Sequence, residues 1–216
     1  MRQGFSLAKM LFAGVVAAVV GGCGTSPPAR LYTLTPIPQQ EMKAVERQGA
    51  HPVSVSVAPV DIPDYLDRSP IVTRDGTTGL KLAEFHRWGG SLGDNITTVL
   101  VENLSALLSS DRVVAYPGMR YGTPDFRTEV RVLRLDCIPE DRVELKAQWL
   151  VVTGEERQEV ARGLSTFTER VAGGSYESLV AAVSGAVGQL SREIAQGMTV
   201  AKDALSTSPA QVRPKE

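Results

Sequence analysis

Two segments of the chain carry apolar residues at the three- and four-residue spacing of an amphipathic helix. The first begins at Ser91, whose hydroxyl can cap a helix, and Asp94 completes a weak variant of the capping box. Its apolar stripe comprises Leu92, Ile96, Val99, Leu100, Leu104, Leu107 and Leu108. The polar positions that are predicted to face water are Asn95, Glu102, Asn103 and Ser109.

The second helical segment follows the Gly173-Gly174 break, is capped by Ser175 and is predicted to end near Met198. Its stripe comprises Leu179, Val180, Val183, Val187, Leu190, Ile194 and Met198. The remaining residues, 199–216, are rich in serine, threonine and proline and are predicted to form a disordered tail.

The other patterned segments alternate or are dense in β-formers, which predicts strands. Residues 143–149 show the pattern best, because Val143, Leu145, Ala147 and Trp149 alternate with charged or polar residues. The predicted strands are 30–35, 53–57, 71–74, 80–85, 112–116, 128–137, 143–153 and 159–171, with a loop at 36–51. Turns at 75–79, 139–141 and 154–157 predict hairpins, and the acidic tip Glu155-Glu156 is predicted to be solvated.

This order predicts a single α+β domain over residues 31–198, with a mostly antiparallel sheet and two long helices packed on one face. The chain of 216 residues is long enough for such a core. No internal repeat is visible.

The first 22 residues differ from the rest of the chain. Arg2 and Lys9 are their only charges, and the apolar run from Met10 to Val20 would span about 16 Å as a helix, too short for a bilayer. A basic start, a short apolar run and small residues before a cleavage point are typical of a secretory signal peptide.

The run ends in Val20-Gly21-Gly22-Cys23, which resembles the bacterial lipobox. This resemblance implies cleavage between Gly22 and Cys23, a diacylglyceryl group on the Cys23 thiol and an acyl group on its new amine. It also implies sorting to the outer membrane, since Gly24 stands where an aspartate would favour retention in the inner membrane. Residues 23–30 then form a lipidated tether. An ordinary signal peptide with a coincidental cysteine is the alternative.

The composition of the chain excludes several classes of function and of site. The net charge of −1 argues against general nucleic-acid binding. Two cysteines and two histidines leave little material for a disulfide scaffold, a zinc site or a Ser-His catalytic site. If Cys23 is acylated, Cys137 is left without a disulfide partner, and we expect it to be a buried small hydrophobe.

No catalytic motif, cofactor motif or metal motif is found in the sequence. Gly163-Leu164-Ser165-Thr166-Phe167 lacks the closing glycine of a nucleophile elbow. His51 and His86 have no obvious sequence partner and are expected to be structural or exposed. The triplet Asp61, Asp64 and Asp67 lacks the alternate spacing of a calcium loop, so turns and charge pairing are the simpler interpretation.

Several motifs in order resemble the PqiC-type auxiliary lipoproteins of ABC-type intermembrane transport systems. They are Leu31–Leu34, Val57–Arg68, Ile71–Arg74, Phe85–Leu92 and Leu145–Trp149. The resemblance implies an outer-membrane lipoprotein that faces the periplasm and works in lipid transport, supporting membrane integrity. The implied partners are a periplasm-spanning MCE-domain tube and its ABC transporter subunits. It implies no enzyme activity.

Docking on a tube favours a head-to-tail ring of identical subunits. The candidate docking residues are Tyr65 and Leu66, in a proline-flanked loop, and Trp88 before the first helix. The alternatives are that Tyr65 and Leu66 plug the end of the sheet and that Trp88 packs as a helix staple. A different function also stays open, that of a structural or assembly lipoprotein that partners an outer-membrane β-barrel.

Overall fold

The computed structural model describes residues 27–38, 52–118 and 122–207. The signal peptide, Cys23, His51 and most of the predicted loop at 36–51 lie outside the described residues. The elements, in chain order, are β1 (Arg30–Tyr32), β2 (Val55–Val57), β3 (Pro70–Asp75), β4 (Gly79–Trp88), α2 (Leu92–Leu107), β5 (Val113–Ala115), β6 (Phe126–Ile138), β7 (Arg142–Thr153), β8 (Glu159–Arg170) and α3 (Tyr176–Thr207).

The strands form two sheets rather than the one expected. A five-stranded sheet has the order β5-β2-β6-β7-β8, and a three-stranded sheet has the order β1-β4-β3. The long neighbours β6, β7 and β8 pair antiparallel, as do β3 and β4, whereas β2 pairs parallel with β5 and β6, and β1 parallel with β4. The hairpin prediction at 75–79 is confirmed by the pairing of Asp75 with Gly79.

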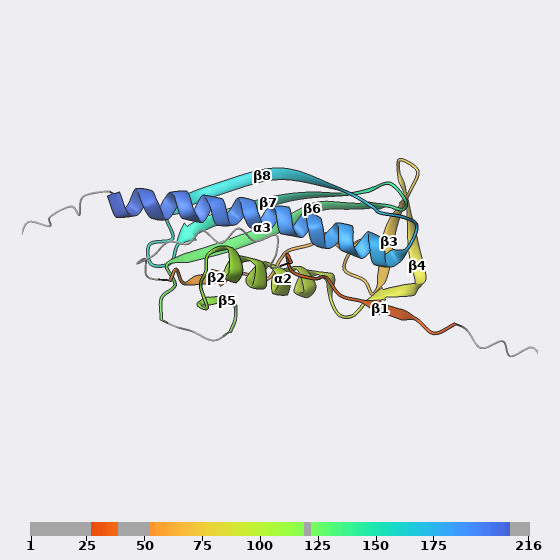
Figure 1. Cartoon of the computed structure of the whole chain (residues 1–216), viewed down its shortest axis with the longest axis horizontal. Helices are drawn as coiled ribbons and strands as arrows, with labels where there is room; N and C mark the ends of the chain where they lie inside the picture. Colours follow the sequence, from red (N-terminus) through yellow and green to blue (C-terminus); the bar gives the residue numbers. More distant parts are fainter. Residues whose placement is uncertain (1–26, 39–51, 119–121, 208–216) are drawn as a thin grey trace, which may run out of the picture.

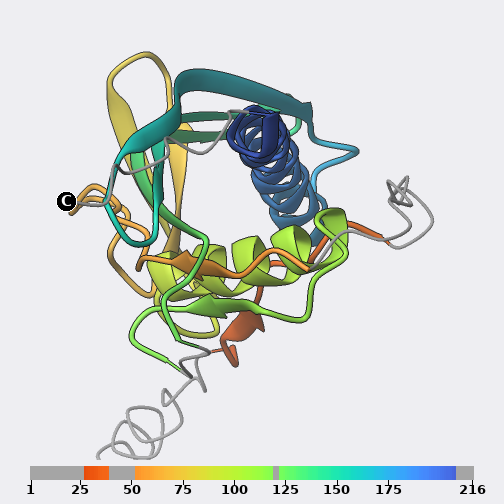
Figure 2. The same ribbon diagram turned by 90° about the vertical axis from the view of Figure 1, so that its left-hand side faces the viewer.

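The two helices lie on one face of the five-stranded sheet (Figures 1 and 2). The long helix α3 runs along β7 and β8, α2 packs on β2 and β5, and the helices contact each other. The three-stranded sheet lies at the end of the molecule where the N-terminal segment enters, and the C-terminal end of α3 lies at the opposite end (Figure 1). The architecture is therefore a single α+β domain, as predicted.

The predicted apolar stripes form the core between the helices and the sheets. All seven stripe residues of α3 are buried, and so are five of the seven of α2; Leu107 and Leu108 are partly buried. On β7 the alternation also holds, since Val143, Leu145, Ala147 and Trp149 are buried. The Cys137 thiol is buried in the same core, which confirms the expectation for that residue.

The cap of α2 is confirmed, because the Ser91 hydroxyl accepts a hydrogen bond from the Asp94 amide at 3.4 Å. One prediction for this helix is wrong. Asn103 does not face water but is fully buried between the helices, with its side chain hydrogen-bonded on both sides.

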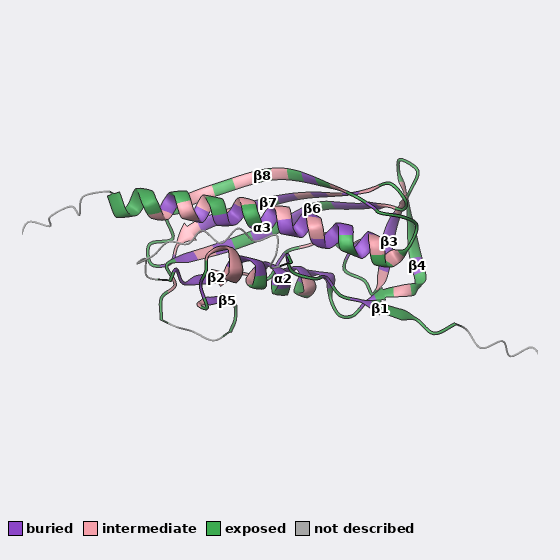
Figure 3. Cartoon of the chain, viewed as in Figure 1, coloured by how far each residue is buried: buried purple, intermediate pink, exposed green. Residues whose placement is uncertain are grey.

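Helix α3 continues beyond Met198 to Thr207, so residues 199–207 are not a disordered tail. Ala201 extends the buried face by one turn, and the Ser206 and Thr207 hydroxyls hydrogen-bond back to the Asp203 carbonyl. Figure 3 shows that this last part of the helix is largely exposed. Residues 208–216 lie outside the described part.

The strand predicted at 30–35 ends at Tyr32. Beyond it, side chains of the helices replace a strand as hydrogen-bond partners of the backbone. The Thr35 amide donates to the Ser184 hydroxyl at 3.1 Å, and the Ile37 amide donates to the Asn103 side-chain oxygen at 2.8 Å. Because these contacts lie between segments far apart in the sequence, the local pattern did not reveal them.

Candidate functional site

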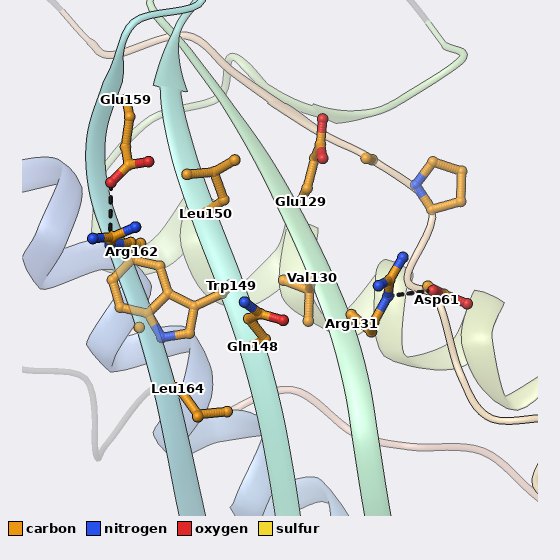
Figure 4. Close-up of a pocket in the computed structure, with 13 residues that line it drawn as sticks. Asp61, Glu129, Val130, Arg131, Gln148, Trp149, Leu150, Glu159, Arg162 and Leu164 are labelled. Atoms are coloured by element: carbon orange, nitrogen blue, oxygen red, sulfur yellow. Dashed lines mark hydrogen bonds and ion pairs between the residues drawn. The ribbon is translucent and has the colours of Figure 1, made fainter.

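A groove of about 760 Å³ lies on the exposed face of β6, β7 and β8. It is bounded on one side by residues 58–61, which follow β2. The strand residues that line it include Arg131, Gln148, Leu150, Arg162 and Leu164 (Figure 4). They alternate with residues of the buried face, so their side chains point away from the helices.

An ion pair stands on each side of the groove (Figure 4). Asp61 pairs with Arg131 at 2.6 Å, and Glu159 pairs with Arg162 at 3.3 Å. Asp61 is held there by its backbone, which bridges to β6 through hydrogen bonds with Val130 and Val132. Both pairs are exposed, so each contributes at most about 1 kcal/mol to folding and is free to exchange partners.

Between these ion pairs lie an amide, Gln148, and two leucines. Leu164 is the more exposed of the two leucines, at 61 %. The residues lining the groove include no histidine, cysteine, serine or threonine. What the groove offers is an apolar centre with a rim of charges of both signs, an arrangement typical of contact surfaces between proteins.

The floor of the groove is fixed to α3 through Trp149. Its indole ring lies against Gly163 on β8, where an added Cβ atom would come within 2.4 Å of the indole nitrogen. The indole N–H donates to Glu193 on α3 at 3.0 Å, and the Ser165 hydroxyl donates to the same carboxylate. The sheet and the helix are thus joined beneath the exposed face.

The structure buries two of the three predicted docking residues. Leu66 and Trp88 are buried, which contradicts their interpretation as docking residues. The Leu66 amide donates to the Pro63 carbonyl in a tight turn that folds the side chain inward, and Trp88 ends β4 within the core. Burial agrees with the alternatives only in placing both side chains within the packed core.

Tyr65 is partly buried against the same core. Its hydroxyl accepts a hydrogen bond from the Leu135 amide at 3.3 Å, and burial raises the pKa of the phenol. The side chain is therefore engaged in holding the turn 63–66 on β6. It is not free to reach a partner.

His86 belongs to an aromatic cluster that sequence reasoning missed. Its ring stacks on Tyr176 with centroids 3.9 Å apart, and its Nδ1 atom lies 2.7 Å from the Tyr32 hydroxyl. Burial and the nearby Glu177 carboxylate raise the pKa of Tyr32. The cluster joins β1, β4 and the start of α3, so His86 is structural, as expected; its partners lie too far along the chain for any motif to show.

Within the described ranges, no group of three or more metal-ligating side chains is present. Of the aspartate triplet, Asp61 is occupied by Arg131. In the same ranges, no helix has both the length and the apolar character needed to cross a membrane.

A family model described as "ABC-type transport auxiliary lipoprotein component" matches residues 32–195. The chain belongs to this family. The match covers the domain that the motifs indicated, from β1 through most of α3. The resemblance proposed from the sequence is therefore confirmed at the level of the family. No curated protein matches the chain.

Two solved structures share the fold of this auxiliary lipoprotein. A protein from Xanthomonas campestris, XCC0632, is 14 % identical, with a TM-score of 0.66 over 83 % of this chain and 100 % of that chain. A structure described as an uncharacterized protein is 19 % identical, with a TM-score of 0.65 over 80 % and 99 % of the two chains. At these identities, the likeness concerns the fold alone.

Proposed function

We propose that this auxiliary lipoprotein docks a periplasm-spanning MCE-domain tube of an ABC-type intermembrane lipid transport system to the outer membrane. The observation that carries the proposal is the family match over residues 32–195. The lipobox at Val20–Cys23 supports it, because three acyl chains on Cys23 would hold the domain at a membrane surface almost irreversibly.

The groove on β6–β8 supplies a candidate surface for the partner. It combines the exposed Leu164 and the half-buried Leu150 with two exchangeable ion pairs, so a partner segment could bury the leucines and take over the charges. Its floor is fixed to α3 through Trp149 and Glu193, so little ordering of the protein would be needed on binding.

A ring of identical subunits completes the proposal, since a tube presents the same surface repeatedly around its axis. Sedimentation of the full-length protein in detergent at micromolar concentration tests this part. A ring would sediment as one closed oligomer. A monomer throughout the concentration range would contradict the ring, although not the docking.

The first experiment is a detergent pull-down of the tagged full-length protein, with mass spectrometry of its partners. We expect an MCE-domain protein together with its ABC subunits. A β-barrel as the only stable partner would overturn the proposal and favour the assembly function. The same mass spectrometry on the Cys23→Ala variant should show an unprocessed precursor without acyl chains.

Groove variants locate the contact. Leu164→Asp places a charge in the apolar centre of the groove and should release the partner. Thr166→Asp is the matched control, because Thr166 is exposed on the same face of β8, does not line the groove and stands opposite Lys146. Equal retention of the partner by both variants would exclude this groove as the contact.

A further inference from the structure

The three-stranded sheet exposes a concentration of apolar side chains. In the described part of the chain, nine large hydrophobic residues are exposed, and four of them lie on β1 and β4. These four are Leu31, Leu80, Leu82 and Phe85. Leu31 is 68 % exposed, Leu82 43 % and Phe85 39 %. Exposed apolar side chains gathered on one sheet mark a contact surface.

Two of these side chains, Leu82 and Phe85, border a hollow of about 540 Å³ that the N-terminal segment helps to form. Pro27 and Ala29 line it from one side, and Leu82, Phe85 and Arg87 line it from β4. The segment that leads to the anchor thus lies directly beside the exposed apolar residues. We refer to Leu31, Leu82, Phe85 and this hollow as the β1–β4 face.

The distance along the chain between this face and the anchor is short. Cys23 precedes Pro27 by four residues, and four residues span at most about 14 Å when fully extended. If Cys23 carries its acyl chains in the outer membrane, Pro27 stays within that distance of the membrane surface whatever path the tether takes. The hollow that Pro27 lines therefore stays near the lipid head groups.

The charges around the β1–β4 face also suit a lipid surface. Strands β1 and β4 together carry three basic residues, Arg30, Lys81 and Arg87, and one acidic residue, Glu84. All four are exposed. Basic side chains next to apolar ones are typical of segments that lie in the head-group region, where the apolar groups enter and the cations contact phosphate.

We propose that the β1–β4 face rests on the membrane in which Cys23 is anchored, with Leu31, Leu82 and Phe85 in the head-group layer. This inference rests on the lipid anchor of the proposed function. The anchor makes the second contact intramolecular, so a weak interaction of a few side chains is sufficient to orient the domain. The end of the molecule that carries the C-terminus of α3 then points away from the membrane (Figure 1).

The test uses full-length, acylated protein in vesicles of phosphatidylethanolamine and phosphatidylglycerol. An environment-sensitive fluorophore is attached to Leu82→Cys and, in a second protein, to Phe85→Cys. The matched control is Leu164→Cys, which is also exposed, at 61 % against 43 % and 39 %, but lies in the groove of the other sheet. The buried Cys137 thiol does not compete for the label as long as the protein is folded.

We expect lipids that carry a nitroxide near the head group to quench the label at positions 82 and 85 and to leave the label at 164 bright. Equal fluorescence and equal quenching at the three positions would overturn the proposal. A different result would also overturn it. If the labels at 82 and 85 report an apolar environment, are not quenched by the lipid nitroxides and respond more strongly as the protein-to-lipid ratio rises, the face contacts a second copy of the chain.

The two proposals fail in distinguishable ways. If the anchor is absent, mass spectrometry finds no acyl chains on Cys23 and the protein does not join the vesicles. If the anchor is present and the label at Leu82→Cys stays unquenched, only the orientation proposed here is wrong, and the docking function is unaffected.

Discussion

The side-chain amide of Asn103 on α2 donates a hydrogen bond to the hydroxyl of Ser191 on α3, at 3.0 Å, and both residues are fully buried. The Asn103 oxygen accepts the Ile37 amide at 2.8 Å, and the Ser191 hydroxyl donates to the Val187 carbonyl. One asparagine thus joins both helices to the segment that follows β1. The polar side chain of Asn103 is tolerated in the core because its oxygen and its nitrogen both have hydrogen-bond partners.

Asn103→Leu should destabilise the protein by about 1–3 kcal/mol, because it leaves the Ile37 amide without its partner in the core. Urea unfolding followed by circular dichroism measures the loss. Glu102→Gln is the matched control, since Glu102 is the exposed neighbour on the same helix, and it should stay within about 0.5 kcal/mol of the wild type. Equal stability of the two variants would show that the network contributes nothing.

Asn103 also shows where the sequence stops being informative. The apolar stripe of α2 was readable because 3.6-residue periodicity places its members on one face. An asparagine beside that stripe is compatible with either water or a polar partner on another helix. Its partners Ile37 and Ser191 are 66 and 88 residues away, so no local pattern could choose between them.

A second prediction concerns Gly163, which lies beneath the ring of Trp149. An added Cβ atom would meet the indole at 2.4 Å, and Trp149 cannot move aside without losing its bond to Glu193. Gly163→Ala should therefore cost about 1–3 kcal/mol through overpacking. Leu164→Ala is the control. Leu164 is the next residue along β8 and points to the opposite, exposed face, so this variant should change the unfolding midpoint little. A stable Gly163→Ala protein with an unchanged midpoint would contradict this packing.

A third prediction concerns the two sheets, which are joined by Arg74 on β3 and Asp136 on β6 at 2.7 Å. Asp136 also forms an ion pair with Arg134 at 3.1 Å. The Arg74 side chain is 22 % exposed and that of Arg134 is 48 %, so water screens the second pair more. Arg74→Ala should destabilise by about 1–3 kcal/mol and Arg134→Ala by less than about 1 kcal/mol. Urea titrations of the two variants compare them directly, and the reverse ranking would refute the assignment.

The division into two sheets was beyond prediction for a related reason. Alternation identified nearly every strand, and the turns at 75–79 and 139–141 gave the hairpins β3–β4 and β6–β7. The alternation of apolar and polar residues could not show that β2 pairs parallel with strands that come far later in the chain, or that β1 pairs with β4.

The prediction of the docking residues failed for the same reason, because a buried Trp88 and an exposed Trp88 look alike in the sequence. The groove and the β1–β4 face combine residues from several strands, so they became visible only in the structure.

Cys137 gives a prediction about pH. Burial, and to a smaller extent the nearby Asp136 charge, raise the pKa of its thiol to about 12 from an ordinary value of 9.0. Below about pH 9 the thiol is protonated in both the folded and the unfolded chain, so it makes no difference to stability. Above that pH the unfolded chain releases the proton while the folded chain retains it. Stability should therefore fall between about pH 9 and pH 12, by up to about 1.4 kcal/mol per pH unit from this group.

The measurement is the free energy of unfolding in urea at several pH values between 8 and 10, with Cys137→Ala as the comparison. We expect the wild type to lose stability relative to this variant as the pH rises, because the variant has no thiol to titrate in the unfolded chain. Tyr32, whose pKa is also raised by burial, is present in both proteins and cancels in the difference. Parallel pH profiles for the two proteins, or rapid reaction of the native thiol with a thiol reagent at pH 8, would show that Cys137 is not shielded as the structure places it.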